Sequence, residues 1–115
     1  DQYDNIIKLC KWNDKLILTT LHGFVKIWNP NTKNFENIFQ PCTSRIAKLC
    51  VWQKYIVLFE MFGRTIKILD IETGQLKTTL INHSCSIFSI AILNDHKIVS
   101  SSYDETIRIW NPEFG

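Results

Sequence analysis

The sequence predicts an all-β fold of about three four-stranded antiparallel units. Three observations support it: a repeat with a period of 41 residues, an alternation of Val or Ile with charged residues inside each repeat, and no helical periodicity. Alternation with a period of two indicates strands, because successive side chains of a strand point to opposite faces of the sheet. Of the 115 residues, 45% are hydrophobic and 21% are charged, which is ordinary globular usage.

The repeat is clearest in the third strand of each unit. Segments 21–29, 62–70 and 103–111 share one register, in which Trp28, Leu69 and Trp110 are 41 residues apart. The residues just before these positions alternate between Val or Ile and Lys or Arg. We therefore expect strands at 25–28, 66–69 and 107–110.

The other strands follow in the same order within each unit. The first strands are expected at 7–12, 46–52 and 87–93, and the second strands at 15–20, 55–60 and 97–102. A polar turn with Pro or Gly then breaks the ladder before fourth strands at 35–40 and 75–80. Four short strands per unit of about 40 residues are typical of a propeller blade. We expect blades at 1–40, 41–82 and 83–115, all within one domain.

Composition and cysteine spacing exclude several classes of protein. The net charge of +2 is spread along the chain, which argues against a polybasic arm for nucleic acid or membrane surfaces. No apolar stretch is long enough for a transmembrane span, and no leader pattern opens the chain. The four cysteines contain no Cys-x-x-Cys pair, so we expect no metal site and no cofactor, and interpret Cys10 and Cys50 as small buried hydrophobes. The cytoplasm is the expected location, with the nucleus as the alternative.

The last unit resembles a WD repeat (tryptophan-aspartate repeat) of the β-propeller family. The segment Ile98-Val-Ser-Ser-Ser-Tyr-Asp-Glu-Thr-Ile-Arg-Ile-Trp110-Asn111 follows the family pattern nearly position by position. The resemblance implies a buried hydrogen-bond chain of four side chains: His83, Ser100 (or Ser102), Asp104 and Trp110. Such a chain is chemically reasonable, because an imidazole can link a carboxylate to a hydroxyl and the indole N–H can donate to it.

The first two units depart from this pattern. The first keeps Trp28 but has His22 at the Asp position, whereas the second has Leu69 for the Trp and Gly63 for the Asp. The resemblance therefore implies that these two blades rely on apolar packing.

The chain stops shortly after the third strand of the last unit. About three repeats are fewer than the 4 to 8 blades of closed propellers. We expect a partial propeller whose last blade lacks its outer strand, namely the C-terminal piece of a larger propeller. A boundary cut within a loop and self-association of two copies are the alternatives.

One narrow face of the predicted propeller carries the candidate binding residues. The residue before the turn Asp position is Leu21, Phe62 or Tyr103, with Arg64 beside Phe62 and Arg45 in the preceding loop. Aromatic and Arg side chains are favoured interface anchors. The alternatives are packing of Leu21 and Phe62 against a neighbouring blade and a merely solvated Arg45.

These residues predict a non-catalytic scaffold that binds a protein partner of unknown identity. The set His83, Ser100 and Asp104 mimics a hydrolase triad, but the family pattern places its hydroxyl inside the blade, and no phosphate loop or nucleophile elbow occurs. We therefore predict that the protein is not an enzyme. An RNA-binding propeller segment is the alternative function. For Lys26, Lys67 and Arg108, which recur at one position of each unit, we expect solvated strand charges rather than an RNA-binding stripe.

Overall fold

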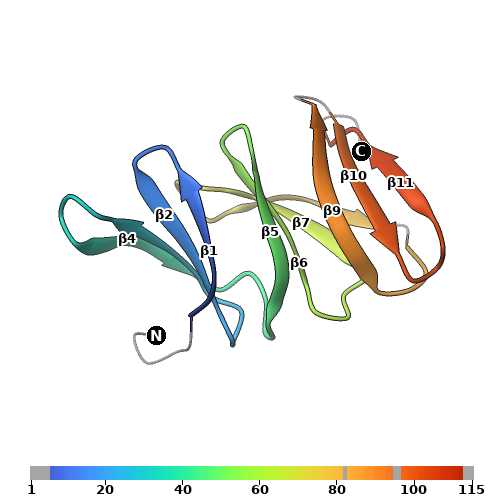
Figure 1. Cartoon of the computed structure of the whole chain (residues 1–115), viewed down its shortest axis with the longest axis horizontal. Coiled ribbons are helices and arrows are strands. Elements are labelled where there is room, and N and C mark those ends of the chain that lie inside the picture. Colours follow the sequence, from blue (N-terminus) through green and yellow to red (C-terminus); the bar gives the residue numbers. More distant parts are fainter. Residues whose placement is uncertain (1–5, 82, 95–96, 113–115) are drawn as a thin grey trace.

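The computed structural model of the chain describes residues 6–81, 83–94 and 97–112. These residues form eleven strands in three antiparallel sheets that lie side by side along the long axis of the molecule (Figure 1). The predicted all-β class is confirmed. No helix among the described residues is long and apolar enough to cross a membrane.

Each sheet is a meander in which consecutive strands pair. The first sheet comprises β1 (Ile6–Trp12), β2 (Lys15–Thr20), β3 (Val25–Asn29) and β4 (Asn34–Phe39). The second sheet comprises β5 (Ile46–Trp52), β6 (Tyr55–Glu60), β7 (Thr65–Asp70) and β8 (Leu76–Ile81). The third sheet has three strands among the described residues: β9 (Ile87–Asn94), β10 (Lys97–Ser102) and β11 (Ile107–Trp110).

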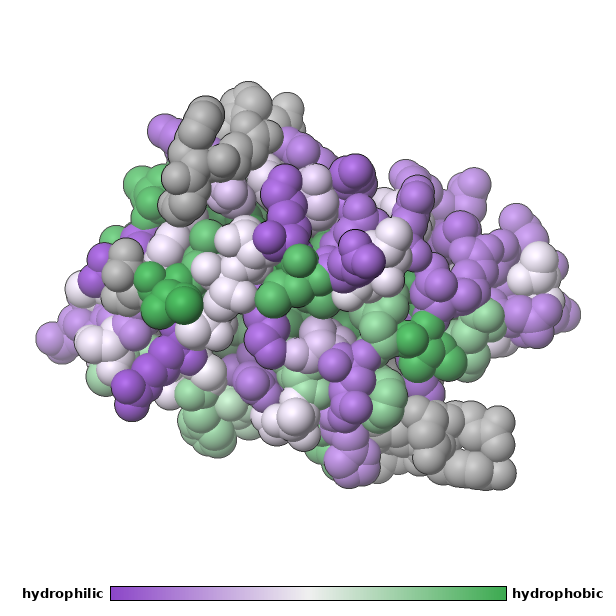
Figure 2. Space-filling view, turned by 180° about the vertical axis from the view of Figure 1, so that it is seen from behind, coloured by the Kyte–Doolittle hydropathy of each residue, from purple (hydrophilic) through white to green (hydrophobic). Residues whose placement is uncertain are grey.

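Tight turns join the strands because the local sequence supplies residues that tolerate them. The β1–β2 and β5–β6 hairpins turn over two residues, and the first of these is left-handed at Asn13 (φ 53°) and at Gln53 (φ 56°). Hydrophilic side chains gather over the β3–β4 turn at the tip of the first sheet, as Figure 2 shows. The turns therefore separate the strands where the polar residues predicted a break.

Two hydrophobic clusters fill the spaces between neighbouring sheets. One joins the first and second sheets around Ile17, Ile27 and Ile56, and the other joins the second and third sheets around Ile68 and Trp110. Each sheet thus buries one face of alternating strand residues against the next sheet, which is how blades of a propeller stack.

The outward face of the third sheet is apolar and uncovered by the described residues. Ile66 and Ile68 of β7 are 0% exposed under the third sheet, whereas their counterparts 41 residues later, Ile107 and Ile109, are 74% and 63% exposed. The same residue types therefore occupy the same strand positions with opposite burial, because a neighbouring sheet covers only the first pair.

The expectation that the recurrent basic residues are solvated is wrong for two of them. Lys26 is only 2% exposed, and the Lys67 ammonium donates a hydrogen bond of 2.6 Å to the carbonyl of Pro41. The third, Arg108, is half-buried and its Nε is fully buried. These side chains point between the sheets, where the aliphatic stems pack and the charged ends reach backbone oxygens.

The cysteines are less uniform than expected. Cys10 and Cys50 are half-buried rather than buried, and each packs at the margin of a different cluster. Cys42 is buried and Cys85 is exposed, and all four thiols are free.

Candidate functional site

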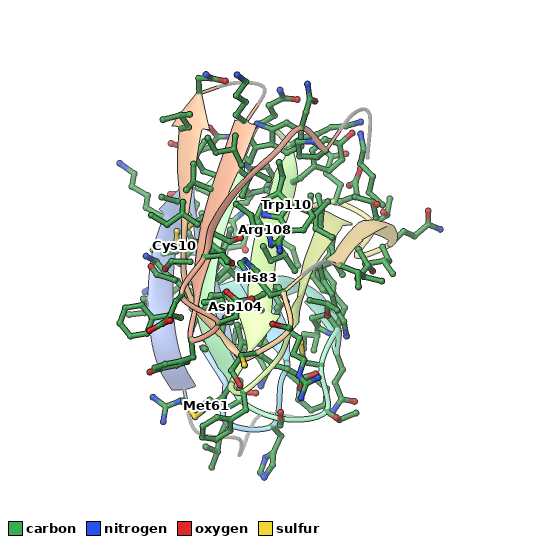
Figure 3. All side chains as sticks on the ribbon, turned by 90° about the vertical axis from the view of Figure 1, so that its right-hand side faces the viewer. Cys10, Met61, His83, Asp104, Arg108 and Trp110 are labelled. Carbon is green, nitrogen blue, oxygen red and sulfur yellow. The ribbon has the colours of Figure 1, made fainter. Side chains whose placement is uncertain are left out.

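The third sheet brings together four polar side chains from separate elements. His83 lies in the loop before β9, Ser100 lies on β10, Asp104 lies in the β10–β11 turn and Trp110 ends β11. The His83 Nε2 atom is 2.7 Å from the Ser100 hydroxyl, which also accepts a hydrogen bond of 2.8 Å from the Trp110 indole N–H. The His83 Nδ1 atom is 3.0 Å from a carboxylate oxygen of Asp104. In Figure 3, Trp110, His83 and Asp104 follow one another from the middle of the sheet towards the end marked by Met61.

Burial makes this chain of hydrogen bonds obligatory. Ser100 is 1% exposed, and His83 and Trp110 are also buried, so water cannot replace the missing partners. A neutral His83 with its proton on Nδ1 satisfies every group: the indole donates to Ser100, Ser100 donates to Nε2, and Nδ1–H donates to Asp104. The buried hydroxyl is therefore held in a structural role and is closed to a substrate.

Ser102, the other serine that fits the family pattern, has different partners. Its hydroxyl lies 3.1 Å from the carbonyl of Cys85 and 2.9 Å from that of Ser86, and it accepts the backbone N–H of Asp104. Ser102 therefore joins the β10–β11 turn to the loop before β9, while Ser100 holds the middle of the chain.

Asp104 connects the same two segments as an ionised carboxylate. The hydroxyl of Thr106 is the strongest of several donors that hold the pKa of Asp104 well below its usual range. His83 and the backbone N–H groups of Ser84 and Thr106, the last two at 3.0 Å each, act in the same direction, and burial opposes them. Sequence reasoning did not select Thr106, although an Asp followed two residues later by Thr is a recognisable turn pattern.

The second sheet fills the equivalent positions with apolar groups. The positions of His83, Ser100 and Trp110 are taken by Cys42, Leu58 and Leu69, all buried in the cluster between the first two sheets. Burial raises the pKa of the Cys42 thiol to about 11. The expectation that this blade relies on apolar packing therefore holds in the structure.

The five candidate binding residues all lie at the end of the sheets that carries turns 21–24, 61–64 and 103–106, here called the turn face. Phe62 and Tyr103 are 79% and 67% exposed, and Leu21 and Arg64 are also exposed. Arg45 is not simply solvated, because it is half-buried and its Nε is buried without a partner.

A groove of about 290 Å³ lies on the turn face between the second and third sheets. Its walls are Met61 and Phe62 on one side and Phe88 and Tyr103 on the other, and Ile87 also contributes to its lining. The rings of Phe88 and Tyr103 meet edge to face, with centroids 5.3 Å apart. Sequence reasoning selected Phe62 and Tyr103 but missed Phe88, because only the packing of the sheets brings this outward strand residue next to the turn.

The family model for the WD domain, G-beta repeat, matches residues 74–111, which contain the hydrogen-bonded side chains described above. The chain belongs to the WD-repeat β-propeller family. It is a segment of a WD-repeat scaffold, and solved WD40 propellers share its arrangement. The crystal structure of the RRP9 WD40 repeats matches with a TM-score of 0.78 at 16% identity, covering 95% of this chain and 36% of that one. The structure of U3-55K matches with a TM-score of 0.77 at 16% identity, covering 95% and 36%.

Curated relatives match this WD-repeat segment over a small part of their own length. The Caenorhabditis elegans periodic tryptophan protein 2 homolog is 30% identical over 118 residues, which cover 96% of this chain and 13% of that protein. The Saccharomyces cerevisiae U3 small nucleolar RNA-associated protein 12 is 26% identical over 101 residues, covering 86% of this chain and 11% of that protein. Dictyostelium discoideum protein tipD is 40% identical over 53 residues, covering 45% of this chain and 9% of that protein.

Proposed function

We propose that this WD-repeat segment is a non-catalytic scaffold that presents its turn face to a protein partner. The observation that carries the proposal is the exposure of Phe62 and Tyr103, at 79% and 67%, on turns of neighbouring sheets. Large aromatic side chains left in water on a well-ordered surface are the residues that most often anchor a protein interface.

The turn face is built to hold these side chains in place. The Tyr103 N–H donates to the carbonyl of Ser86, and the Ser86 hydroxyl donates to the carbonyl of Phe62, each at 3.1 Å. The Ile87 N–H donates to the carbonyl of Gly63 at 2.7 Å, so the turn of the second sheet is tied to the start of the third. A surface fixed in this way loses little conformational entropy when a partner binds.

The remaining contacts of the scaffold are proposed from its uncovered sheet. We assign residues 1–40, 41–82 and 83–115 to three blades, the last of them incomplete, and propose that the outward face at Ile107 and Ile109 packs against a further blade of the same propeller. Apolar faces of this kind are rarely left in water. A solution mass of the isolated segment that is a defined dimer would favour self-association instead, and a monomer with a cooperative melt would refute the need for any covering.

Location and nucleic-acid binding are proposed from the relatives. The name of the yeast relative connects it with U3 small nucleolar RNA, which supports the nucleus as the location. The expected cytoplasmic location receives no support from the relatives. Direct RNA binding is the second candidate, and it requires several phosphate contacts with a steep dependence of affinity on salt.

Photo-crosslinking in cells tests the scaffold function and separates the two candidates. The intact protein would carry Tyr103→p-benzoylphenylalanine on the turn face, or Asn31→p-benzoylphenylalanine in the exposed β3–β4 turn at the opposite end as the matched control. The proposal expects one dominant protein adduct from position 103 that is absent from position 31. RNA adducts at position 103 would replace it with the alternative, and identical adduct patterns at both positions would refute a binding role for the turn face.

A further inference from the structure

The turn of the second sheet has an unusual backbone at an aromatic residue. In the first and third sheets the left-handed residue of the turn is Gly23 (φ 86°) or Glu105 (φ 69°), and these two residues occupy equivalent positions. In the second sheet the left-handed residue is instead Phe62 (φ 64°), two positions earlier in the repeat. L-residues with a bulky side chain rarely adopt this region, because Cβ crowds the neighbouring carbonyl oxygen.

Packing inside the molecule does not repay this strain. The Phe62 ring is the most exposed large hydrophobic side chain of the described residues, at 79%. Strained backbone that persists at an exposed aromatic residue is a feature of binding surfaces, where the side chain is held in the position that a ligand requires.

The altered turn places Phe62 on one wall of the groove described above. Tyr103 and Phe88 form the opposite wall as an edge-to-face pair. The volume of about 290 Å³ lies at the lower end of ligand pockets, so the groove suits one or two side chains of a bound segment better than a cofactor.

Charges beside the groove are unequally engaged. Arg64 follows Phe62 in the turn, and the carbonyl of Arg45 accepts the N–H of Met61 at 2.8 Å, so both arginines belong to the Phe62 side. Among the described residues neither arginine forms an ion pair. The carboxylates of the turn face are bonded internally at Asp104 and at Glu60, where Ser44 donates at 2.6 Å, and Glu105 lies exposed on the third turn. The Phe62 side of the groove is therefore complementary to an acidic ligand.

We propose that this groove binds an extended, acidic peptide segment of the protein partner. One large apolar side chain of that segment inserts between Phe62 and Tyr103, and a neighbouring carboxylate pairs with Arg64 and Arg45. The inference rests on the proposed scaffold function and specifies the chemistry of its partner. Two arginines are too few for the series of phosphate contacts that RNA binding requires, so the peptide is favoured.

Fluorescence polarisation on the intact protein tests the groove with defined probes. Three labelled peptides would share one length: a central Leu-Phe flanked by Asp and Glu, the same centre flanked by Lys and Arg, and a central Ser-Gly flanked by Asp and Glu. A labelled oligouridine would serve as the RNA probe. The first peptide is expected to bind at least about tenfold more tightly than the other peptides and the RNA.

Variants connect the binding to the groove. Phe62→Gly is expected to weaken the acidic Leu-Phe peptide by about tenfold while leaving the melting temperature unchanged or higher, because glycine adopts positive φ without strain. Tyr103→Ala should weaken it similarly through the opposite wall, and Arg64→Gln should abolish the preference for acidic flanks. Asn13→Gly makes the same exchange at a left-handed position of the opposite end and should change nothing.

Two results would overturn the inference: equal binding of all three peptides, or unchanged binding by the Phe62→Gly and Tyr103→Ala variants. Tight binding of the oligouridine alone would also overturn it, in favour of RNA. If position 103 still crosslinks to a protein while the peptides fail, the groove chemistry is refuted and the scaffold function stands.

Discussion

Removal of the Ser100 hydroxyl should destabilise the third sheet by an amount that follows from its hydrogen bonds. Ser100→Ala deletes the atom that accepts from Trp110 and lies 2.7 Å from His83, and both of these side chains are buried. Each buried polar group left without a partner costs about 1–3 kcal/mol, so we expect a loss of about 3 kcal/mol in the free energy of unfolding. Ser101→Ala on the same strand, where no side-chain hydrogen bond is lost, is the matched control and should stay within about 0.5 kcal/mol.

Hydrogen exchange measures this loss locally in the intact protein. About 1.4 kcal/mol corresponds to a factor of ten, so amides of β10 and β11 should exchange about a hundredfold faster in Ser100→Ala. In a Trp110→Phe background the indole donor is already absent, and Ser100→Ala then leaves only His83 without a partner. The cost of Ser100→Ala should therefore fall by about 1 kcal/mol in that background.

The result that would refute this reasoning is equality between Ser100→Ala and Ser101→Ala. It would mean that the buried chain adds nothing beyond ordinary strand packing, and that the family pattern at His83, Ser100 and Trp110 has no energetic consequence. Strict additivity of Ser100→Ala and Trp110→Phe would refute the direct coupling between these two side chains.

Three further predictions follow from single residues. The pKa of Asp104 is lowered on folding, so the stability it contributes is present above the ordinary carboxyl pKa of about 4 and is lost as pH falls below it; urea midpoints in acid should show this slope, and Asp104→Asn should flatten it. Gly23→Ala should lower stability by about 2–4 kcal/mol in thermal melts, because a Cβ there would lie 2.3 Å from the carbonyl oxygen of Cys42 at φ 86°; an unchanged melting temperature would contradict this close approach. Burial and a pKa of about 11 should protect Cys42 from iodoacetamide at neutral pH while exposed Cys85 reacts, as mass spectrometry can follow; equal rates in the native protein would refute the burial.

Much of the fold could be read from local pattern because strand formation and turn formation are local. The alternation at 107–110 predicted β11 at its observed bounds, and the 15–20, 55–60 and 97–102 strands were predicted with equal accuracy. The repeat also placed His83, Asp104 and Trp110 in register, so their proximity followed from one resemblance. The structure adds the choice of Ser100 over Ser102, since only the direction of each hydroxyl decides between two serines on one strand.

The sequence by itself determined which residues share a face of each strand, but the packing of sheets decided which faces meet water. Ile68 and Ile109 are identical in type and position, yet one is 0% and the other 63% exposed, because a neighbouring sheet covers only the first. Lys26 was expected in solvent for the same reason and is buried between sheets. The groove at Phe62 and Tyr103 likewise joins two sheets and depends on a left-handed backbone that no local pattern marks. Alternation along a strand is a property of the chain, whereas burial and grooves arise only when separate strands of distant sequence pack together.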